Sequence, residues 1–277
     1  MSKECKEKES RMSELIQWPR AKWWDKAWNP VIGCKPCSPA CSHCYAAAWA
    51  KRFGQSFEPH ATKQKPPRKG VVFCGNMTDL FGEWVHRLGI DGEEFIKQTG
   101  EMFRAPTATY LYLTKRVDRM CRALCNGSDP SYDIVRNEGY MMRNYSMWNH
   151  YFGFTAERQD WYAFRFADWL KSPDWVKGWI SAEPLLGPLN LHLAEYPNNS
   201  KHNIKWLVVG CESGPNRRPC KMEWVESIVD QCREAGVPVF VKQICLPNGK
   251  FTNKIEEFPK HLQIRQVPWA KKEGGEE

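Results

Sequence analysis

Residues 204–210 read Ile-Lys-Trp-Leu-Val-Val-Gly, residues 222–235 are compatible with a helix, and residues 237–243 read Val-Pro-Val-Phe-Val-Lys-Gln. Short β-branched and aromatic runs bounded by Gly or Pro are typical of strands. A helix between two such runs is typical of a βαβ unit, whose strands lie parallel. This stretch therefore predicts an α/β fold built on a parallel sheet.

The same alternation extends toward the N-terminus. Other strand-like runs lie at 30–33, 71–75, 108–114, 151–155 and 176–182. Helix-compatible segments lie at 45–53, 91–104, 116–125 and 160–171. Together with the first stretch they give about seven strands. We expect a parallel (β/α) partial barrel, similar to a TIM barrel, over residues 25–260, with a lead-in at 1–24 and a tail at 261–277.

The composition predicts a folded chain without a membrane anchor. Of the 277 residues, 42% are hydrophobic and 13% aromatic, which is enough to bury a core. No run of 18 apolar residues is present, so we expect no membrane span. The first ten residues are largely charged and contain no apolar stretch, so we expect no secretory signal and a cytoplasmic location.

The charge balance and the cysteine content both indicate partners. The chain has 40 Lys and Arg against 32 Asp and Glu, and a net charge of +8 favours an anionic partner such as a nucleotide or nucleic acid. Disulfides are rare in a reducing compartment, where thiols more often serve metals or catalysis. Four of the 12 cysteines fall within eleven residues, so we expect a metal site there.

Polar or ionisable residues stand just after most of the strand-like runs. In a parallel barrel these positions meet at the C-terminal face, where active sites lie. We therefore expect them to converge, although some would also serve as helix caps or as a solvated rim. They are Asn76, Asp79, Thr114, Lys115, Arg116, Glu157, Arg158, Ser181, Glu183, Glu212, Ser213, Lys242 and Gln243.

The cysteine cluster allows more than one set of ligands. The segment 33–45 reads Gly-Cys-Lys-Pro-Cys-Ser-Pro-Ala-Cys-Ser-His-Cys-Tyr. Cys37, Cys41 and Cys44 have the spacing C-x3-C-x2-C, and Cys34, Cys41 and Cys44 have the spacing C-x6-C-x2-C. All four together are suited to one tetrahedral zinc ion, which would staple the loop.

Three thiolates favour a different metal group. A [4Fe–4S] cluster takes four cysteines for full ligation, so a cluster with three keeps one iron open. That iron can bind the amino and carboxylate groups of S-adenosylmethionine (SAM), whose reductive cleavage gives a 5′-deoxyadenosyl radical. C-x3-C-x2-C followed by an aromatic residue, after the first strand of a βα barrel, is the radical-SAM signature.

The chain resembles a phage-associated and bacterial family of radical-SAM-like proteins with a three-Cys motif, catalogued as a domain of unknown function. The resemblance covers roughly residues 25–260. It is carried by Trp28-Asn29-Pro30-Val31-Ile32-Gly33-Cys34, Ser38-Pro39-Ala40-Cys41-Ser42-His43-Cys44-Tyr45-Ala46, Asn76-Met77-Thr78-Asp79-Leu80-Phe81, Leu113-Thr114-Lys115-Arg116, Ser181-Ala182-Glu183-Pro184-Leu185-Leu186-Gly187-Pro188, Gly210-Cys211-Glu212-Ser213-Gly214-Pro215 and Phe240-Val241-Lys242-Gln243.

The resemblance implies a ligand set, cofactors and a substrate class. It favours Cys34, Cys41 and Cys44 as the cluster ligands, with Cys37 as an alternative or additional thiolate. The implied cofactors are a [4Fe–4S] cluster and SAM, served by a low-potential electron donor. The phage association implies modification of a nucleotide or DNA base. The family usually has Gly where this chain has Ala40 and Cys211, so a thiol is added at the second position.

The remaining site residues divide into two groups. No catalytic residue is assigned. We expect cofactor contacts from His43, Asn76, Asp79, Lys115, Glu157, Glu183, Glu212 and Ser213, and substrate contacts from Arg116, Lys242 and Gln243. The leading hypothesis is a radical-SAM enzyme acting on a nucleotide or DNA base. The alternative is a zinc-stapled, non-catalytic nucleic-acid-binding protein.

Two other features of the sequence have open interpretations. The aromatic and basic stretch 18–28 is suited either to stacking on bases or to closing one end of a barrel. Apart from the cluster and Cys211, the chain has seven further cysteines, which have no common spacing. We expect them to be small hydrophobic residues of the core. They are Cys5, Cys74, Cys121, Cys125, Cys220, Cys232 and Cys245.

Overall fold

The computed structural model describes residues 16–86, 107–124, 149–195, 204–214 and 216–269. These residues form an α/β fold with a mostly parallel sheet of eight strands in the order β11-β10-β9-β8-β7-β6-β5-β2. The described strands do not close into a ring, so the partial barrel stays a prediction. The strands are β2 (Lys26–Trp28), β5 (Gly70–Cys74), β6 (Ala108–Thr114), β7 (His150–Thr155), β8 (Gly178–Ala182), β9 (Ile204–Gly210), β10 (Val239–Cys245) and β11 (Phe251–Thr252).

Most of the predicted strands and helices are confirmed. The runs 108–114 and 204–210 are β6 and β9, and the segment 222–235 is helix α7 (Met222–Ala235). The other helices are α2 (Tyr45–Arg52), α4 (Val117–Leu124) and α6 (Gln159–Trp169). The predicted helix at 91–104 lies outside the described residues.

The prediction that the strand at 30–33 opens the parallel sheet is wrong. Residues Val31–Ile32 form β3, which pairs antiparallel with β4 (His60–Ala61) in a separate two-stranded sheet. The strand that precedes the cysteines in the large sheet is β2, which pairs parallel with β5. Strand β2 ends at Trp28, because the Asn29 N–H donates to the Gln64 side chain at 3.0 Å and Pro30 has no N–H group to continue the ladder.

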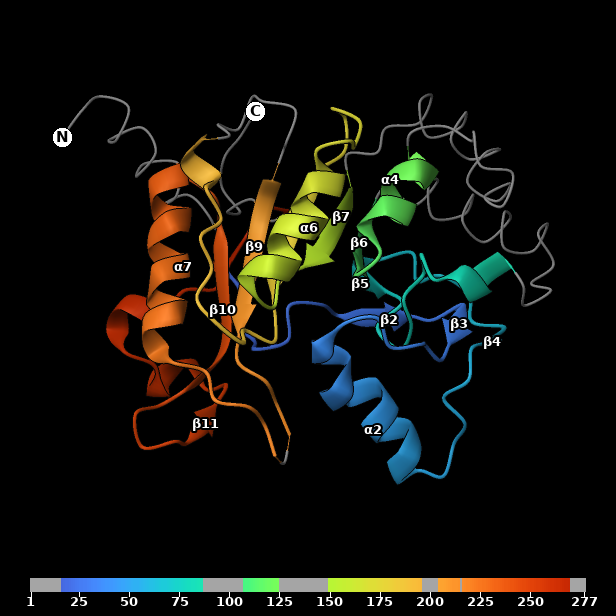
Figure 1. The fold of residues 1–277 in the computed structure, drawn as a ribbon, viewed down its shortest axis with the longest axis horizontal. Helices are drawn as coiled ribbons and strands as arrows, with labels where there is room; N and C mark the ends of the chain where they lie inside the picture. The colour runs from blue at the N-terminus through green and yellow to red at the C-terminus, as the bar shows by residue number, and fades with distance from the viewer. Residues whose placement is uncertain (1–15, 87–106, 125–148, 196–203, 215, 270–277) are drawn as a thin grey trace. The chain divides into compact units, whose positions relative to one another are not determined.

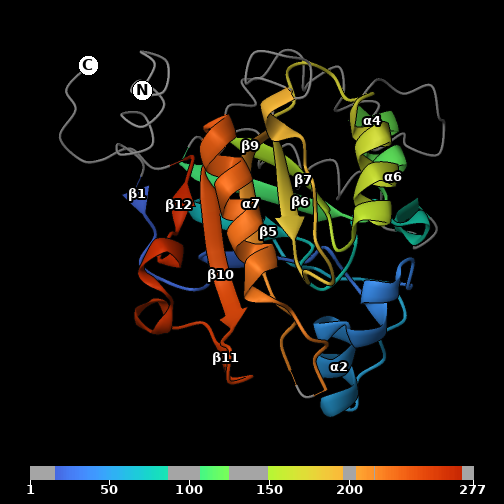
Figure 2. The same cartoon turned by 60° about the vertical axis from the view of Figure 1, so that its left-hand side comes forward.

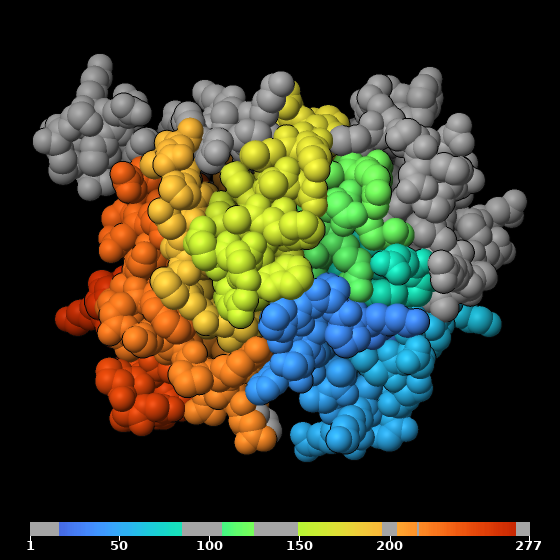
Figure 3. Space-filling model, in the orientation of Figure 1, coloured from blue at the N-terminus to red at the C-terminus, as the bar shows by residue number. Residues whose placement is uncertain are grey.

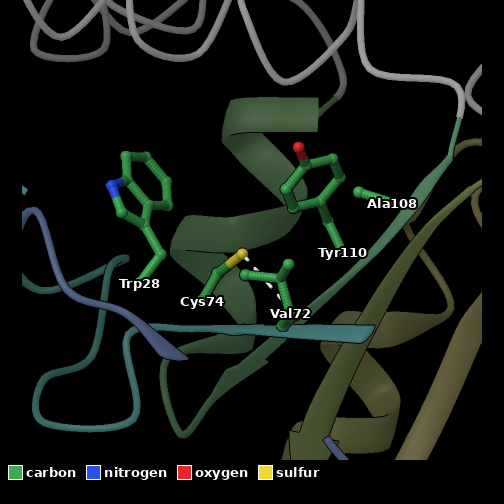
Figure 4. Close-up of a cluster of buried hydrophobic side chains, with 5 residues drawn as sticks. All are labelled: Trp28, Val72, Cys74, Ala108 and Tyr110. Atoms are coloured by element: carbon green, nitrogen blue, oxygen red, sulfur yellow. Dashed lines mark hydrogen bonds between the residues drawn. The ribbon is translucent and has the colours of Figure 1, made fainter. Parts of the chain in front are cut away.

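The chain divides into two compact units, and the first of them is called here the cysteine-loop unit. It comprises Trp24–Thr155 and Ala163–Lys177. Its strands β2, β5, β6 and β7 are parallel neighbours in that order. Figure 4 shows side chains of β2, β5 and β6 gathered into one buried cluster, which joins the three strands. The cluster comprises Trp28, Val72, Cys74, Ala108 and Tyr110.

Two helices accompany the strands of the cysteine-loop unit. In Figure 1, α4 and α6 lie in front of β6 and β7. The ring of Trp169 on α6 lies 5.7 Å from the ring of Phe154 on β7, and both side chains are fully buried. Helix α4 buries five side chains, including Met120 and Leu124. Apolar burial of this kind is the main stabilising contribution to such a layer.

The second unit comprises Met1–Trp23, Ala156–Tyr162 and Gly178–Glu277. Its strands β8, β9 and β10 are parallel, and β11 pairs antiparallel with β10. Helix α7 packs on β9 and β10, as Figure 2 shows. Trp23 packs against both Trp179 and Trp206, with ring centroids at 5.2 and 5.4 Å. Trp23 is therefore buried in the second unit and does not present its ring for stacking on a base, and closure of a barrel end stays a prediction.

The ends of the described chain pair with each other in the second unit. Strand β1 (Ile16–Gln17) pairs antiparallel with β12 (Gln266–Val267), so parts of the predicted lead-in and tail have regular structure. Residues 1–15 and 270–277 lie outside the described residues. Within the described part of the chain, no helix combines the length and the apolar character needed to cross a membrane.

Candidate functional site

The cysteine loop, defined as residues 33–44, is held in place by the turn that follows β5. The Gly33 N–H donates to the carbonyl of Met77 at 3.1 Å, and the Thr78 hydroxyl donates to the carbonyl of Gly33 at 2.6 Å. Gly33 has a φ of 97°, a conformation in which a side chain is strained. The Cys34 N–H donates to the carbonyl of Phe57 at 3.2 Å. The first cysteine is therefore fixed through its own N–H and through the residue before it.

Asn29 and Asn76 connect the start of the cysteine loop to the same turn. The Asn29 amide donates to Oδ1 of Asn76 at 2.7 Å, and its own Oδ1 accepts the Met77 N–H at 3.0 Å. The Tyr45 hydroxyl donates to the Asn76 carbonyl. Asn76 was predicted as a cofactor contact, and its amide oxygen and carbonyl are here engaged in holding the loop and the first residue of α2.

The thiols of Cys37 and Cys41 form a hydrogen-bonded pair. Cys41 lies on a short 3₁₀ helix, η1 (Pro39–His43), and both side chains are half-buried. The Cys37 thiol donates to Cys41, which lowers the pKa of Cys41 to about 4 and raises the pKa of Cys37. The Ser38 hydroxyl also lies 3.7 Å from the Cys41 sulfur. The lowered pKa favours the thiolate form of Cys41 over that of Cys37.

Cys34 lies in a different environment within the same loop. Burial and the nearby Asp79 carboxylate raise the pKa of its thiol to about 12, against the opposing effect of the Arg116 guanidinium. Cys44 lies close enough to contribute to the same pKa shift. The raised pKa favours the protonated form of Cys34, and binding of a metal by this thiol would release the proton.

Asp79 joins the ends of β5 and β6. Its Oδ1 accepts hydrogen bonds from the Thr114 hydroxyl at 2.7 Å and from the Phe81 N–H at 3.0 Å. Its Oδ2 accepts the Lys115 N–H at 3.1 Å and lies 3.1 Å from the Arg116 guanidinium. The convergence of polar residues after parallel strands is therefore seen within the cysteine-loop unit.

Arg116 links this carboxylate to the cysteine loop. Its Nη1 binds Asp79, and its Nη2 donates to the carbonyl of Lys35 at 2.9 Å. The guanidinium carbon lies 4.6 Å from the centre of the Trp84 ring, at a distance typical of a cation–π interaction. Sequence reasoning gave no role to Trp84, and nothing in its local pattern distinguishes it from a core tryptophan.

The donor chemistry of the loop fits an iron–sulfur cluster or zinc, but the thiols are not assembled around a common point. Within the described ranges, no group of three or more Cys, His, Asp or Glu side chains is arranged to hold a metal ion. Soft thiolates are the ligands that Fe–S clusters and zinc prefer. Metal sites commonly form only when the metal binds, so the loop would contract around it.

In the second unit, Glu183 and Lys242 form an ion pair beside Gly210, which lies on the strand between theirs. Lys242 Nζ lies 2.9 Å from Oε1 of Glu183, and both side chains are largely buried. A Cβ atom on Gly210 would lie 2.8 Å from the same oxygen, so a larger residue there would require the Glu183 carboxylate to move. Glu183 follows β8, Gly210 ends β9 and Lys242 lies on β10. Three neighbouring strands therefore bring these residues together.

Glu212 and Gln243 are also engaged within the second unit. Glu212 accepts the backbone N–H of Arg218 at 2.8 Å and its Nε–H at 3.1 Å, and its side chain is 4% exposed. Arg218 was not predicted, because an arginine in a loop gives no distinctive signal. The Gln243 amide donates to the carbonyl of Cys211 at 2.5 Å. These contacts hold the loop after β9 against the end of β10.

The other predicted site residues are spread over different environments. Glu157 is completely buried in the second unit, and its carbonyl accepts the Leu186 N–H at 2.9 Å. Ser213 and His43 are exposed. Lys115 is partly exposed and lowers the pKa of Cys41, after the larger effect of Cys37. The structure therefore brings Lys115 to the cysteine loop and places Glu157 away from solvent.

The tertiary structure brings two further cysteines into contact. Cys211 follows β9 and Cys245 ends β10, and their side chains are neighbours. Burial and the neighbouring Cys245 raise the pKa of Cys211. Cys220 lies near Cys245, and burial raises its pKa to about 12. Cys220 is buried in the core as expected, and the fold also places Cys220 and Cys245 near Cys211.

One family model matches residues 19–263 of the chain, which include the cysteine loop and all eight strands of the large sheet. The chain belongs to the DUF5131 family. Its description is "protein of unknown function", so it names no activity, cofactor or source. Comparison with curated proteins and with solved structures gave no significant match. For this DUF5131 protein, the radical-SAM chemistry and the phage association therefore stay predictions.

Proposed function

We propose that this DUF5131 protein is a radical-SAM enzyme that modifies a nucleotide or DNA base and holds its [4Fe–4S] cluster in the cysteine loop. The proposal is carried by the hydrogen-bonded pair Cys37 and Cys41, which stabilises a thiolate in a loop anchored beside the ends of two parallel strands. A thiolate is the form of cysteine that binds iron. Bound by three thiolates, the cluster would keep one iron for SAM and supply the electron that cleaves it.

The residues around the loop have roles in binding and positioning. Arg116 fixes the loop through the Lys35 carbonyl and adds a positive charge beside Cys34. Lys115 adds a second positive charge beside Cys41. Several thiolates in one loop repel each other, and nearby cations reduce that repulsion. Asp79 orients the backbone of Lys115 and the side chain of Arg116.

The ligand set is tested by single substitutions to Ala. We expect Cys34→Ala, Cys41→Ala and Cys44→Ala to lose the cluster and Cys37→Ala to keep it, measured as about four irons per chain after anaerobic reconstitution. Cys74→Ala is the control, because Cys74 is buried in the core on β5. Iron loss in Cys37→Ala with retention in Cys34→Ala would reverse the assignment and make Cys37, Cys41 and Cys44 the ligands.

The enzymatic proposal has a separate test. The iron-loaded, dithionite-reduced protein should cleave SAM to 5′-deoxyadenosine and methionine, which are separated by liquid chromatography. The Cys41→Ala variant should not, because it lacks the cluster. If iron-loaded and reduced protein neither binds nor cleaves SAM, the enzyme proposal fails and the cluster has a structural role.

The contact between Cys37 and Cys41 also favours a second candidate function. It places a fourth thiol beside the proposed ligands, and four thiolates suit one tetrahedral zinc ion. In that case the protein would be a zinc-stapled nucleic-acid-binding module without catalysis. Metal analysis of protein expressed with both iron and zinc present separates the two. Zinc at about one ion per chain that resists exchange by iron would favour the zinc module.

A further inference from the structure

Helix α2 presents a row of aromatic side chains to solvent. Tyr45 and Trp49 are 54% and 46% exposed, and Phe53, the C-cap residue, is 56% exposed. They are spaced four residues apart, so they lie on one face, while Ala46 and Ala50 are buried on another. Figure 3 shows the light-blue atoms of this helix at the surface. Large exposed aromatic residues in a row mark an interaction surface more often than chance exposure of a single side chain does.

The aromatic row is held in a defined arrangement. The Trp49 and Phe53 rings lie 4.8 Å apart at an interplanar angle of 47°. The hydroxyl of Tyr45 donates to the carbonyl of Asn76, which fixes the far end of that side chain. The first residue of the row also follows Cys44 directly. The row therefore begins at the cysteine loop and leads away from it along α2.

Positive charges lie beside these rings on the same helix. No Asp or Glu occurs between Lys26 and Phe57. Lys51 and Arg52 lie in the last turn of α2, and both are exposed. The guanidinium of Arg52 lies 5.7 Å from the centre of the Phe53 ring. A helix that combines exposed rings with cations, in a segment without Asp or Glu, is complementary to a polyanion that also carries flat apolar groups.

We propose that the α2 face, defined as Tyr45, Trp49, Lys51, Arg52 and Phe53, binds single-stranded nucleic acid. The rings stack on successive bases, and the two cations contact phosphates. Because the Trp49 and Phe53 rings already contact each other, a base stacks on the outer face of the pair and not between the two rings. A duplex hides the faces of its bases, so it offers the rings nothing to stack on. Single strands of DNA and of RNA both carry unpaired bases and phosphates, so either could make this contact.

The bound strand is the enzyme's substrate only if the proposed function is correct, so that part of the inference rests on the proposed function. Binding of the strand can be measured without catalysis. The test uses the full-length protein and fluorescently labelled oligo(dT), oligo(U) and a duplex of matched length, followed by anisotropy. We expect both single strands to bind more tightly than the duplex. A preference for one of the two strands would identify DNA or RNA as the ligand.

Substitutions separate stacking from charge. Trp49→Ala and Phe53→Ala should each weaken single-strand binding roughly tenfold, and Trp49→Phe should keep most of it. Phe164→Ala on α6 is the matched control, because that ring is 63% exposed and belongs to a different helix. Lys51→Ala should lower the slope of log affinity against log salt by about 0.7. Circular dichroism of each variant verifies that the protein remains folded.

Three outcomes would overturn the proposal. The first is unchanged binding in Trp49→Ala and Phe53→Ala together. The second is equal affinity for the duplex, which would leave only a generic cationic surface. The third is equally tight binding of polyglutamate, which would favour an acidic protein partner instead. Strand binding is measured without SAM, so the two proposals can fail separately. Protein that binds single strands but does not cleave SAM would overturn the enzyme proposal alone. Protein that cleaves SAM but does not bind single strands would overturn this inference alone.

Discussion

Arg116 and Asp79 form an ion pair with an N–O distance of 3.1 Å, and both side chains are about one-tenth exposed. Arg116 uses its second nitrogen to bind the carbonyl of Lys35 in the cysteine loop. The pair therefore connects the ends of β5 and β6 to the loop that carries the candidate metal ligands. A buried pair of this kind positions a loop, because removing either partner leaves the other charge without compensation.

Arg116→Met should destabilise the protein and impair metal loading. The Asp79 carboxylate would stay buried without its cation, at a cost of about 3 kcal/mol in the free energy of unfolding. Iron content after reconstitution should fall, because the Lys35 carbonyl loses its donor. Arg122→Met is the control: that arginine pairs with Asp118 at 2.8 Å, but both are about half exposed. Its effect should stay within about 0.5 kcal/mol in urea unfolding. Equal effects of the two variants would contradict the role of Arg116.

Gly33→Ala should disrupt the start of the cysteine loop. A Cβ atom there would lie 2.5 Å from the carbonyl oxygen of Glu58, and backbone atoms cannot move aside as a flexible side chain does. We expect a loss of about 3 kcal/mol or more and little bound iron. Gly54→Ala is a close control, because Gly54 also has a positive φ, but a Cβ atom there would meet nothing within 4 Å. Gly54→Ala should cost about 1 kcal/mol and keep the iron. Similar behaviour of both alanine variants would show that strain alone explains Gly33.

Gly210→Ala should displace the Glu183 carboxylate from Lys242. The added methyl group would meet Glu183 Oε1 at 2.8 Å and Gln243 Cγ at 3.2 Å. We expect destabilisation of about 1–3 kcal/mol in thermal or urea unfolding. Gly187→Ala, whose Cβ would meet nothing within 4 Å, should be nearly neutral. A neutral Gly210→Ala would mean that the Glu183 side chain is free to move.

His150 should make the protein less stable at acidic pH. Burial and the nearby Lys177 lower the pKa of this histidine to about 3 from its usual 6.5. The unfolded chain therefore takes up a proton below about pH 6.5 that the folded chain does not. The free energy of unfolding should fall as pH drops from about 6.5 toward 3, with His150 contributing about 2 kcal/mol of loss by about pH 5.

The measurement is urea unfolding of the wild type and two variants between about pH 5 and pH 7. His150→Phe keeps an aromatic ring beside Tyr110, which lies 5.0 Å from the imidazole, and removes the titrating group. Its stability should vary less with pH than that of the wild type. His60→Gln, at an exposed position, should follow the wild type. Parallel pH profiles for wild type and His150→Phe would refute the assignment.

The sequence by itself determined the features that depend on neighbouring residues. Strand β6, strand β9 and helix α7 were predicted with their observed bounds, because the apolar pattern that forms each is contained within it. The four thiols of residues 34–44 are close in space because they are close in the chain. Family membership over 19–263 reflects the same local motifs.

Only the tertiary structure decided which distant side chains meet. In the large sheet, the strand before the cysteine loop is β2 and not the predicted strand at 30–33. The tertiary structure also placed Trp84 against Arg116. It also brought Cys211 to Cys245, two cysteines with no shared spacing. Such contacts depend on the register and packing of whole strands. A sequence pattern shows which face of an element is apolar, but it does not show which other element covers that face.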